Sequence, residues 1–254
     1  MYAEDPHPLA WRVVATPPSL GQKDLHLWRI PLHQGGPDTD GADLGLLSER
    51  QRERLERLRS FEHRQRYLRA QAGCRRILAL YLGVSPTEVS FRYGPAGKPA
   101  LCIDGKRIEF NLTTSGNLAL LGVSADLSLG VDCELESERV HMLDIAGRMF
   151  GADIKSALAA LQPEPRKRLF HLHWTALEAR VKADGRGLSR HREPDPTDLR
   201  VAHACAGEID AKVALCAVAR RELPPPHAWE ALELVDRETG GCAPRAGGGR
   251  PSPR

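Results

Sequence analysis

Two side chains able to do phosphate or metal chemistry, a glutamate and a lysine, follow a tryptophan at a regular spacing of four residues late in the chain. Trp174, Glu178 and Lys182 are four positions apart, which at about 3.6 residues per turn places them on one face of a helix. An aromatic ring, a carboxylate and an ammonium in this order are also typical of a surface ion pair beside a packed tryptophan. Gly185 and Gly187 follow, where a glycine cap is expected to end the helix. The stretch alone leaves a surface and a catalytic interpretation open.

A second acidic element lies upstream, in residues 127–134. Its residues alternate between apolar and polar types, which predicts a strand with Asp132 and Glu134 on the same face. Gly130 precedes them on that face and allows another group to approach closely. If the later helix brings Glu178 against this pair, three carboxylates converge. Such a cluster is a site for a hard cation such as Mg²⁺.

Composition sets the frame for these groups. The chain has 254 residues with 41% hydrophobic and 5% aromatic content, enough for one large or two small domains. Its net charge of +3 points to no class of partner. Residues 51–76, however, hold nine arginines against three glutamates. This stretch is either an anion-binding face or a solvated helix face with internal ion pairs.

Cysteine spacing and targeting patterns exclude several classes. The six cysteines show no C-x-x-C spacing and no histidine spacing typical of a zinc site. The first residues have neither the basic start nor the apolar run of a secretory signal. No apolar stretch approaches the ~18 residues of a membrane span. We therefore expect a cytoplasmic protein without a membrane partner.

Periodicity and turn residues predict the elements that must position the candidate groups. Strands are expected at residues 24–32, 89–93, 100–103, 108–112, 118–124, 127–134, 199–203 and 212–219. Helices are expected at residues 46–82, with a break near Ser60, and at 142–149, 154–161 and 164–183. Asp104-Gly105 indicates a hairpin. Residues 1–22 and 34–42 are expected to be irregular.

Strands and helices mix in both halves of the chain without strict alternation, which indicates an α+β fold rather than a parallel βαβ fold. We expect an N-terminal α+β half at residues 1–126 and a C-terminal α+β half at residues 127–235. The Gly- and Pro-rich residues 236–254 are expected to form a disordered tail.

Four motifs, in this order and spacing, resemble the Sfp-type 4′-phosphopantetheinyl transferases over roughly residues 46–219. They are Gly97-Lys-Pro99, Phe110-Asn-Leu-Thr-Thr-Ser-Gly116, Gly130-Val-Asp-Cys-Glu134 and Trp174-x3-Glu-x3-Lys-x2-Gly-Arg-Gly-Leu188. The resemblance implies a pseudo-twofold monomer of two similar α+β subdomains, with coenzyme A (CoA) and Mg²⁺ in the cleft between them. It also implies transfer of the phosphopantetheine arm of CoA to a serine of an apo acyl or peptidyl carrier protein, with release of 3′,5′-ADP.

The resemblance assigns roles to the acidic and basic residues. Asp132, Glu134 and Glu178 would hold Mg²⁺ on the pyrophosphate, and Lys182 would reach a phosphate oxygen. These residue types suit the reaction, because a cation stabilises negative charge that develops on the leaving and bridging oxygens. The serine must lose a proton to Glu178, or to a water held by Glu134. The sequence leaves this choice open, so Glu178, Lys182 and Glu134 are the predicted catalytic residues.

The predicted CoA-binding residues are cations and hydroxyl groups: Arg54, Arg57, Arg66, Lys98, Thr114, Ser115 and Lys182. In the family, cations on the N-terminal helix hold the CoA 3′-phosphate, and Arg54 and Arg57 match them, with Arg66 toward the adenine. Lys98 is in a Gly-x-Pro turn that suits a phosphate contact. Thr114 and Ser115 are expected on a loop after a strand. Carrier proteins are typically acidic, so remaining positive surface would help docking.

Three positions depart from the family pattern. Thr114 stands where the family usually has a histidine near the CoA phosphates, and a threonine cannot carry the charge. Leu177 and Gln71 stand at positions that are commonly basic. These departures predict altered CoA affinity and carrier selectivity, and none of them changes a predicted metal ligand.

Other functions fit parts of the pattern. Three carboxylates and a lysine would serve another Mg²⁺-dependent phosphoryl or nucleotidyl transferase. A catalytically impaired module that binds a carrier protein or nucleic acid through the arginine-rich face is the alternative from a different class. The carrier itself is left open among fatty-acid, polyketide, nonribosomal-peptide and lysine-pathway proteins, with no nucleic-acid partner expected for the transferase.

Overall fold

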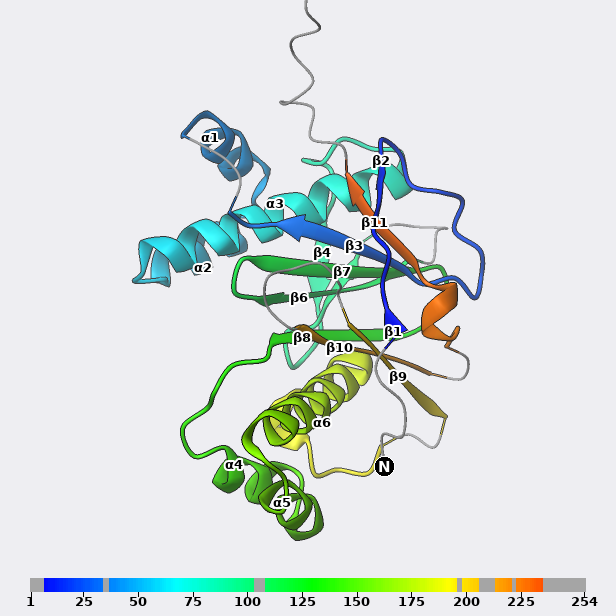
Figure 1. Ribbon diagram of the computed structural model, residues 1–254. Helices are drawn as coiled ribbons and strands as arrows, with labels where there is room; N and C mark the ends of the chain where they lie inside the picture. Colours follow the sequence, from blue (N-terminus) through cyan, green and yellow to red (C-terminus); the bar gives the residue numbers. More distant parts are fainter. Residues whose placement is uncertain are drawn as a thin grey trace, which may run out of the picture.

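Two β-sheets lie face to face between two 22-residue helices, α3 and α6 (Figure 1). The computed structural model describes residues 7–33, 37–102, 108–195, 198–205, 213–220 and 223–234. The helices are α1 (Pro37–Leu46), α2 (Glu49–Arg57), α3 (Phe61–Leu82), α4 (Met142–Met149), α5 (Ala152–Ala159) and α6 (Pro163–Asp184). The strands are β1 (His7–Pro8), β2 (Arg12–Val14), β3 (His26–Pro31), β4 (Phe91–Tyr93), β5 (Pro99–Leu101), β6 (Glu109–Ser115), β7 (Leu118–Ser124), β8 (Leu129–Leu135), β9 (Leu199–Cys205), β10 (Val213–Arg220) and β11 (Glu230–Leu234).

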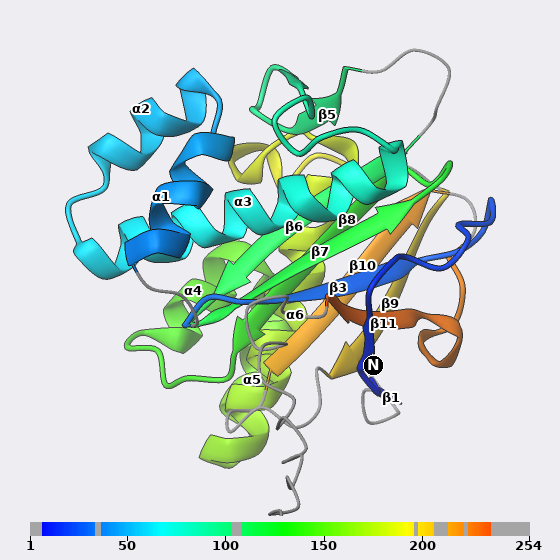
Figure 2. The same ribbon diagram turned by 90° about the horizontal axis from the view of Figure 1, so that it is seen from above.

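The first sheet has the order β2-β11-β3-β7-β6 and is covered by α3. All of β7 is buried, because its two faces pack against different layers. Leu118 and Leu120 point to the second sheet, and Ala119 and Leu121 point to α3. Figure 2 shows α3 running across β6 and β7, with α1 and α2 beside its N-terminal part. This helix thereby places the arginine-rich residues over β6.

The second sheet has the order β1-β9-β10-β8, and α6 packs against its outer face. The alternation of side chains along β8 shows which residues face the helix. Its residues Leu129, Val131 and Cys133 are buried between the two sheets. The alternate positions, which include Gly130 and Asp132, therefore face α6. The position of Cys133 in the core is the one that its place in the alternation predicts.

The first and last described strands each pair with strands from the other predicted half of the chain. The first strand, β1, pairs in parallel with β9 of the second sheet. The last, β11, lies between β2 and β3 of the first sheet and is parallel to both. The expected boundary at residue 126 lies between β7 and β8. The strands β1 and β11, however, pair with strands on the other side of this boundary. The division into two halves stays a prediction about folding units, and the predicted tail at 236–254 lies outside the described residues.

Most predicted elements are confirmed, and α+β is the fold class. The predicted helix at 46–82 breaks at Ser60, whose side chain accepts a hydrogen bond from the His63 N–H and caps α3. The predicted loop at 34–42 is wrong where it overlaps the helix α1. Two short strands, β1 and β2, occupy part of the irregular residues 1–22. Asp104-Gly105 lies outside the described residues.

Two further differences concern strand partners. The strand β5 pairs with β4, and β6 pairs with β7. The strand β6 continues to Ser115, so the prediction that Thr114 and Ser115 lie on a loop is wrong. Among the described helices, none is both long enough and apolar enough to cross a membrane.

Candidate active site

The site begins where α6 crosses β8. A Cβ atom added to Gly130 would lie 2.0 Å from the carbonyl oxygen of Ala179 and 2.5 Å from the backbone nitrogen of Ala183. Contacts this short do not occur in folded proteins, so only glycine lets the helix backbone lie directly on the strand. The group that approaches Gly130 is thus α6 itself, and Asp132, two residues further on, faces the same helix.

Lys182 of α6 lies between two predicted metal ligands. Its Nζ is 2.5 Å from Asp132 Oδ1 and 3.4 Å from Glu178 Oε2. The Asp132 side chain is 3% exposed, and those of Glu178 and Lys182 are 24% and 27% exposed. The helical stripe predicted from the spacing of four is therefore a partly buried ion-pair cluster. A purely solvent-exposed interpretation of Glu178 and Lys182 does not fit.

Burial controls the charge of this cluster. It raises the pKa of Asp132 to about 7, against the opposing effects of Lys182 and a hydrogen bond from Thr113. Burial also lowers the pKa of Lys182, but the Asp132 and Glu178 carboxylates more than offset this, so the pKa of Lys182 lies above its usual value. Lys182 is therefore charged at neutral pH and is the counter-ion of both carboxylates.

One oxygen of the cluster lacks a partner among the described contacts. Asp132 Oδ2 is buried and accepts no hydrogen bond there. An uncompensated buried carboxylate oxygen is costly unless a cation or donor approaches it. Oxygen ligands of this kind are those that Mg²⁺ prefers. The donor set at Asp132 therefore fits a bound divalent cation.

Side chains of β6 complete the free edge of β8. Backbone N–H groups of β8 donate to side-chain oxygens of β6 in three places: Val131 N to Asn111 Oδ1 at 2.8 Å, Cys133 N to Thr113 Oγ1 at 3.5 Å, and Leu135 N to Ser115 Oγ at 3.0 Å. Side chains at every second position of β6 thus accept hydrogen bonds from the backbone N–H groups at every second position of β8. This side-chain ladder joins the two sheets where a backbone ladder would otherwise be needed.

The two hydroxyl groups of the ladder also hold the two strand carboxylates. Thr113 Oγ1 donates to Asp132 Oδ1 at 2.9 Å, and Ser115 Oγ donates to Glu134 Oε2 at 2.9 Å. Ser115 was predicted to bind phosphate; the structure places its hydroxyl on Glu134. Sequence reasoning missed Thr113 because the predicted strand ended at residue 112; extension of the strand to Ser115 places Thr113 and Ser115 on one face.

Glu134 is engaged through both carboxylate oxygens. Besides the Ser115 bond to Oε2, its Oε1 is 3.2 Å from Arg139 Nη2. The three carboxylates that were predicted to converge are therefore divided between two cations. Asp132 and Glu178 contact Lys182, whereas Glu134 contacts Arg139. Within the described ranges, no group of three or more His, Cys, Asp and Glu side chains is close enough to hold a metal ion.

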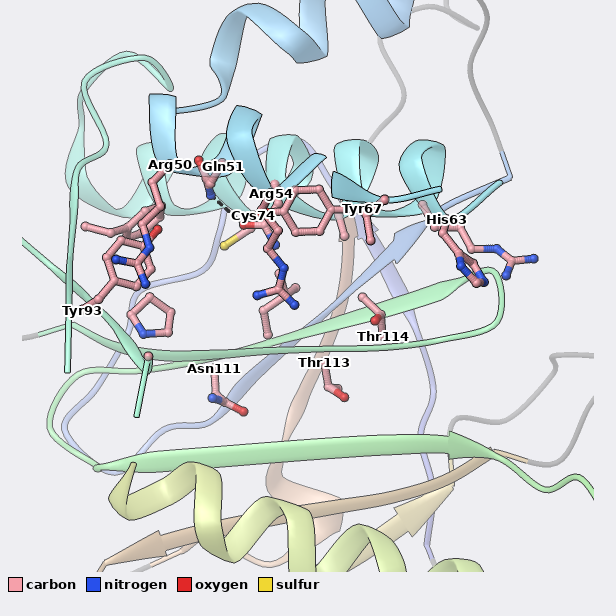
Figure 3. A pocket seen from close by; sticks show the side chains of 18 of the residues that line it. Arg50, Gln51, Arg54, His63, Tyr67, Cys74, Tyr93, Asn111, Thr113 and Thr114 are labelled. Carbon is pink, nitrogen blue, oxygen red and sulfur yellow. Dashed lines mark hydrogen bonds between the residues drawn. The ribbon is translucent and has the colours of Figure 1, made fainter. Parts of the chain in front are cut away.

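A cavity of about 1050 Å³ opens on the other side of β6, below α2 and α3 (Figure 3). Its lining includes Arg54, Arg57 and Arg66, all predicted to bind CoA, together with Thr114. In Figure 3 the Thr114 side chain points into the cavity, whereas Asn111 and Thr113 point toward β8. Adjacent residues of β6 thus face opposite sides: Thr114 faces the cavity, and Thr113 faces the strand carboxylates.

The predicted arginines differ in how firmly they are held. The Arg54 guanidinium lies 5.5 Å from the centre of the Tyr67 ring. Arg57 Nη2 is 3.3 Å from Oε2 of Glu53, one helical turn away, and the Arg57 side chain is 76% exposed. Arg66 donates through Nε to Asn117 Oδ1 at 3.1 Å. Arg66 also pairs with Glu62 one turn away, with Nη2 3.6 Å from Oε2. The internal ion pairs of Arg57 and Arg66 are the arrangement expected of a solvated helix face, whereas Arg54 lies against a ring that lines the cavity.

Lys98 is placed by its turn at the end of α6. Its Nζ donates to the carbonyl oxygens of Ala183 at 2.6 Å and Leu129 at 3.1 Å. Burial lowers its pKa, opposed by Glu109 and Asp184. Its neighbours Gly97 and Pro99 line the cavity. The ammonium therefore ties the β4–β5 turn to α6, and its predicted phosphate contact stays a prediction.

A buried polar network below α2 was not foreseen. Arg75, 3% exposed, donates to Gln51 Oε1 through Nε at 3.0 Å and through Nη2 at 2.9 Å. Gln51 in turn donates to Gln71 Oε1 at 2.6 Å. Gln51 and Gln71 both line the cavity. Gln71, one of the departures from the family pattern, thus belongs to a network around a buried arginine.

The fold and this site together define a class of protein. A buried lysine–carboxylate cluster with a cation-compatible oxygen adjoins a large cavity lined by arginines, which is the arrangement of an enzyme that transfers a phosphate-containing group. The 4′-phosphopantetheinyl transferase superfamily matches residues 128–234 of the chain.

Similar proteins extend this match over most of the chain. The 4′-phosphopantetheinyl transferase HetI of a Nostoc species is 34% identical over 227 residues, which are 86% of this chain and 86% of that protein. A putative 4′-phosphopantetheinyl transferase of a Synechocystis species is 38% identical over 146 residues, 57% of this chain and 59% of that protein. The 4′-phosphopantetheinyl transferase Sfp of Bacillus subtilis is 26% identical over 58% of this chain and 63% of that protein. The chain belongs to the 4′-phosphopantetheinyl transferase superfamily and is a transferase.

Proposed function

We propose that this protein transfers the 4′-phosphopantetheine arm of CoA to a serine hydroxyl of an apo acyl or peptidyl carrier protein. The observation that supports this most directly is the position of Thr113. Thr113 is one of the residues that line the cavity, and its hydroxyl group contacts both Asp132 and Lys182. A large arginine-lined cavity and a buried charge cluster are thereby adjacent, as a reaction at the diphosphate of CoA requires.

The reaction exchanges one bond to phosphorus for another. The serine oxygen forms a bond to the phosphorus that carries the pantetheine arm, the bond from this phosphorus to the bridging oxygen breaks, and 3′,5′-ADP leaves with the electron pair. The serine proton passes to a protein base. Negative charge on the bridging oxygen grows during the step, so a cation held beside it lowers the barrier. Lys182 is the protein cation placed for this role.

We assign the base to Glu178. The described contacts engage both oxygens of Glu134, with Ser115 and Arg139. The described contact of Glu178 is with Lys182, at 3.4 Å through Oε2. A carboxylate with an oxygen available for a new hydrogen bond is the better acceptor for the serine proton. Lys182, which contacts Glu178, then stabilises the charge that remains in the site.

Asp132, Glu134 and Glu178 are the residues that would hold Mg²⁺ on the acidic side of the site, which requires their side chains to come closer together than they lie in the described structure. When bound, Mg²⁺ would supply Lewis-acid stabilisation of the diphosphate oxygens. The support is the buried Asp132 Oδ2 without a described partner, together with the Glu178 carboxylate that contacts the same lysine as Asp132. Thr113 and Ser115 hold two of these carboxylates in place from β6.

CoA would occupy the cavity of about 1050 Å³, at the upper end of the roughly 300–1000 Å³ typical of ligand sites. The arginines above it match an anion with several phosphates. Arg54, which lies against the Tyr67 ring, is the best placed of them, and Arg57 and Arg66 line the cavity beside their ion-pair partners Glu53 and Glu62. An acidic carrier protein, a monomeric state and a cytoplasmic location complete the proposal.

Intact-protein mass spectrometry tests this function. An apo carrier protein is incubated with the enzyme, CoA and Mg²⁺, with EDTA in a parallel sample. We expect a metal-dependent gain of one phosphopantetheine mass on the carrier serine. Asp132→Ala and Glu178→Gln should each lower the rate at least about 100-fold, because each removes a group that acts on developing charge.

Glu138→Gln is the matched control, since Glu138 is 74% exposed and its described ion pair is with Lys167. It should retain the wild-type rate. Transfer by both Asp132→Ala and Glu178→Gln at the wild-type rate would contradict the site assignment. Tight CoA binding without a gain of mass on acyl or peptidyl carriers would contradict the proposed reaction.

A further inference from the structure

The segment between β8 and α4 is attached to α6 at two points. His171 Nε2 lies 3.0 Å from the carbonyl oxygen and 3.2 Å from the backbone nitrogen of Ser137, and its tautomer decides which of the two it bonds. Two residues later the guanidinium carbon of Arg139 lies 5.1 Å from the centre of the Trp174 ring. His171 and Trp174 are three residues apart on α6, so they share one face of the helix. The sequence indicated a packed side chain for Trp174 but no partner for it.

Arg139 is held between an aromatic surface and a carboxylate. Its guanidinium lies 5.1 Å from the Trp174 ring and 5.9 Å from the Phe170 ring. These two rings stack on each other, with centroids 6.2 Å apart and an angle of 11° between their planes. On its other side, Nη2 is 3.2 Å from Glu134 Oε1. A planar guanidinium can meet a ring face and a carboxylate at the same time.

One face of α6 therefore contacts the chain at three points between residues 132 and 139. Lys182 pairs with Asp132, Trp174 supports the partner of Glu134, and His171 binds the backbone of Ser137. Glu178 lies between these contacts, one turn from Lys182 and one turn from Trp174. The regular geometry of the helix thus fixes both strand carboxylates relative to Glu178.

We infer that Arg139 is a positioning residue for Glu134 and that Trp174 is the platform which orients Arg139. The inference rests on the proposed transferase function. Arg139 fixes one carboxylate oxygen while Ser115 fixes the other, so Glu134 keeps a single orientation toward the reacting groups. Outer groups that orient a site carboxylate commonly change activity 10–100-fold when removed.

Substitution of Arg139 with chemical rescue tests this role. Arg139→Ala should lower kcat roughly 10–100-fold. The KM for CoA should stay within about twofold, because Arg139 is not among the described residues that line the cavity. Guanidinium ion at millimolar concentration should restore part of kcat, by occupying the space between Trp174 and Glu134. Urea, which has the same shape without the charge, should not.

Trp174 provides a second variant. Trp174→Phe keeps an aromatic face and should stay close to the wild-type kcat, whereas Trp174→Leu should approach the loss of Arg139→Ala. The double variant Arg139→Ala/Trp174→Leu should lose no more than Arg139→Ala, because both changes act through Glu134. Arg148→Ala is the matched control, since Arg148 is exposed on the nearby α4.

The outcomes separate this role from a general loss of structure and from failure of the proposed function. Absence of transfer by the wild-type protein would count against the function itself. Wild-type kcat in Arg139→Ala, together with a loss in Glu134→Ala, would overturn the positioning role. A loss in Arg139→Ala that guanidinium does not restore, accompanied by a lower melting temperature, would also overturn it in favour of a structural ion pair.

Discussion

At the scale of single residues, two neighbouring positions on β6 have different roles in the site: one holds the charge cluster and the other lines the cavity. Thr113 turns toward β8 and donates to Asp132, and Thr114 turns into the cavity. Strand alternation alone produces this division, because successive side chains leave opposite faces. A change at Thr114 should therefore act on CoA binding and leave the charge cluster in place.

Thr114→His should tighten CoA binding by roughly fivefold, since a charged donor to phosphate contributes more than a hydroxyl. The gain should grow as the pH falls below about 6.5, where an imidazole with an ordinary pKa becomes protonated. Isothermal titration with CoA at two pH values measures both effects. Thr114→Phe is the control, because it adds a ring without a charge or a donor. An equal affinity of Thr114→His and Thr114→Phe would contradict a phosphate contact.

At the scale of elements, the site depends on how closely α6 lies on β8. Gly130 marks the closest point, where an added Cβ would lie 2.0 Å from the Ala179 carbonyl oxygen. The obstacle is helix backbone and not a flexible side chain, so the helix itself would have to move. Such a displacement would separate Lys182 from Asp132 and loosen the contacts of His171 and Trp174 further along the helix.

Gly130→Ala should therefore lower the free energy of unfolding by about 3 kcal/mol, in the range of an overpacked core site. Urea unfolding followed by circular dichroism measures the change. The control is Gly45→Ala on α1, where an added Cβ meets nothing within 4 Å. Gly45→Ala should be neutral or stabilising by up to roughly 1 kcal/mol, because alanine is the better helix former. Equal stabilities of the two variants would show that α6 does not rest on Gly130.

How much of this arrangement the sequence could predict depends on the range of the interaction. The alternation of β8 and the helical spacing of α6 are local, so the faces of Asp132, Glu178 and Lys182 were predictable. The ladder from β6 to β8 depends on how two distant strands are aligned, which no local pattern contains. Arg139 was missed for a similar reason, because its contact depends on the path of the irregular segment after β8.

Local composition was misleading in one helix and uninformative in one strand. The helix α1 includes Gly41 and Gly45 and begins at a proline, which favours a loop on propensity. Its packing against α3 stabilises it, including an ion pair of Asp43 with Arg76 at 2.5 Å. The strand β11 is five residues long, and its place between β2 and β3 is set by partners more than 200 positions away. Tertiary contacts decide both cases.

At the scale of the whole molecule, the first and last described strands each belong to the sheet formed mainly by the other end of the chain: β1 pairs with β9, and β11 lies between β2 and β3. The strand β11 is next to β3 in the first sheet, and its Leu232 is fully buried against Trp28 and the residues of α3. Trp229 and Ala231, at and near the start of β11, are buried instead between the two sheets. The last described element therefore contributes to the cores on both faces of the first sheet, the sheet that carries Thr113 and Thr114.

Leu232→Ala should consequently destabilise the entire protein and not only its C-terminal part. Removal of a fully buried leucine costs about 2–5 kcal/mol, and Leu232 is 0% exposed. Val13→Ala is the matched control, because Val13 lies on the adjacent strand β2 and is 59% exposed; its cost should stay within about 0.5 kcal/mol. Thermal unfolding should show one lowered transition for Leu232→Ala by both circular dichroism and Trp fluorescence, with kcat at low temperature unchanged. Two separate transitions, of which only one shifts, would instead mean that the halves unfold independently and that β11 does not couple them.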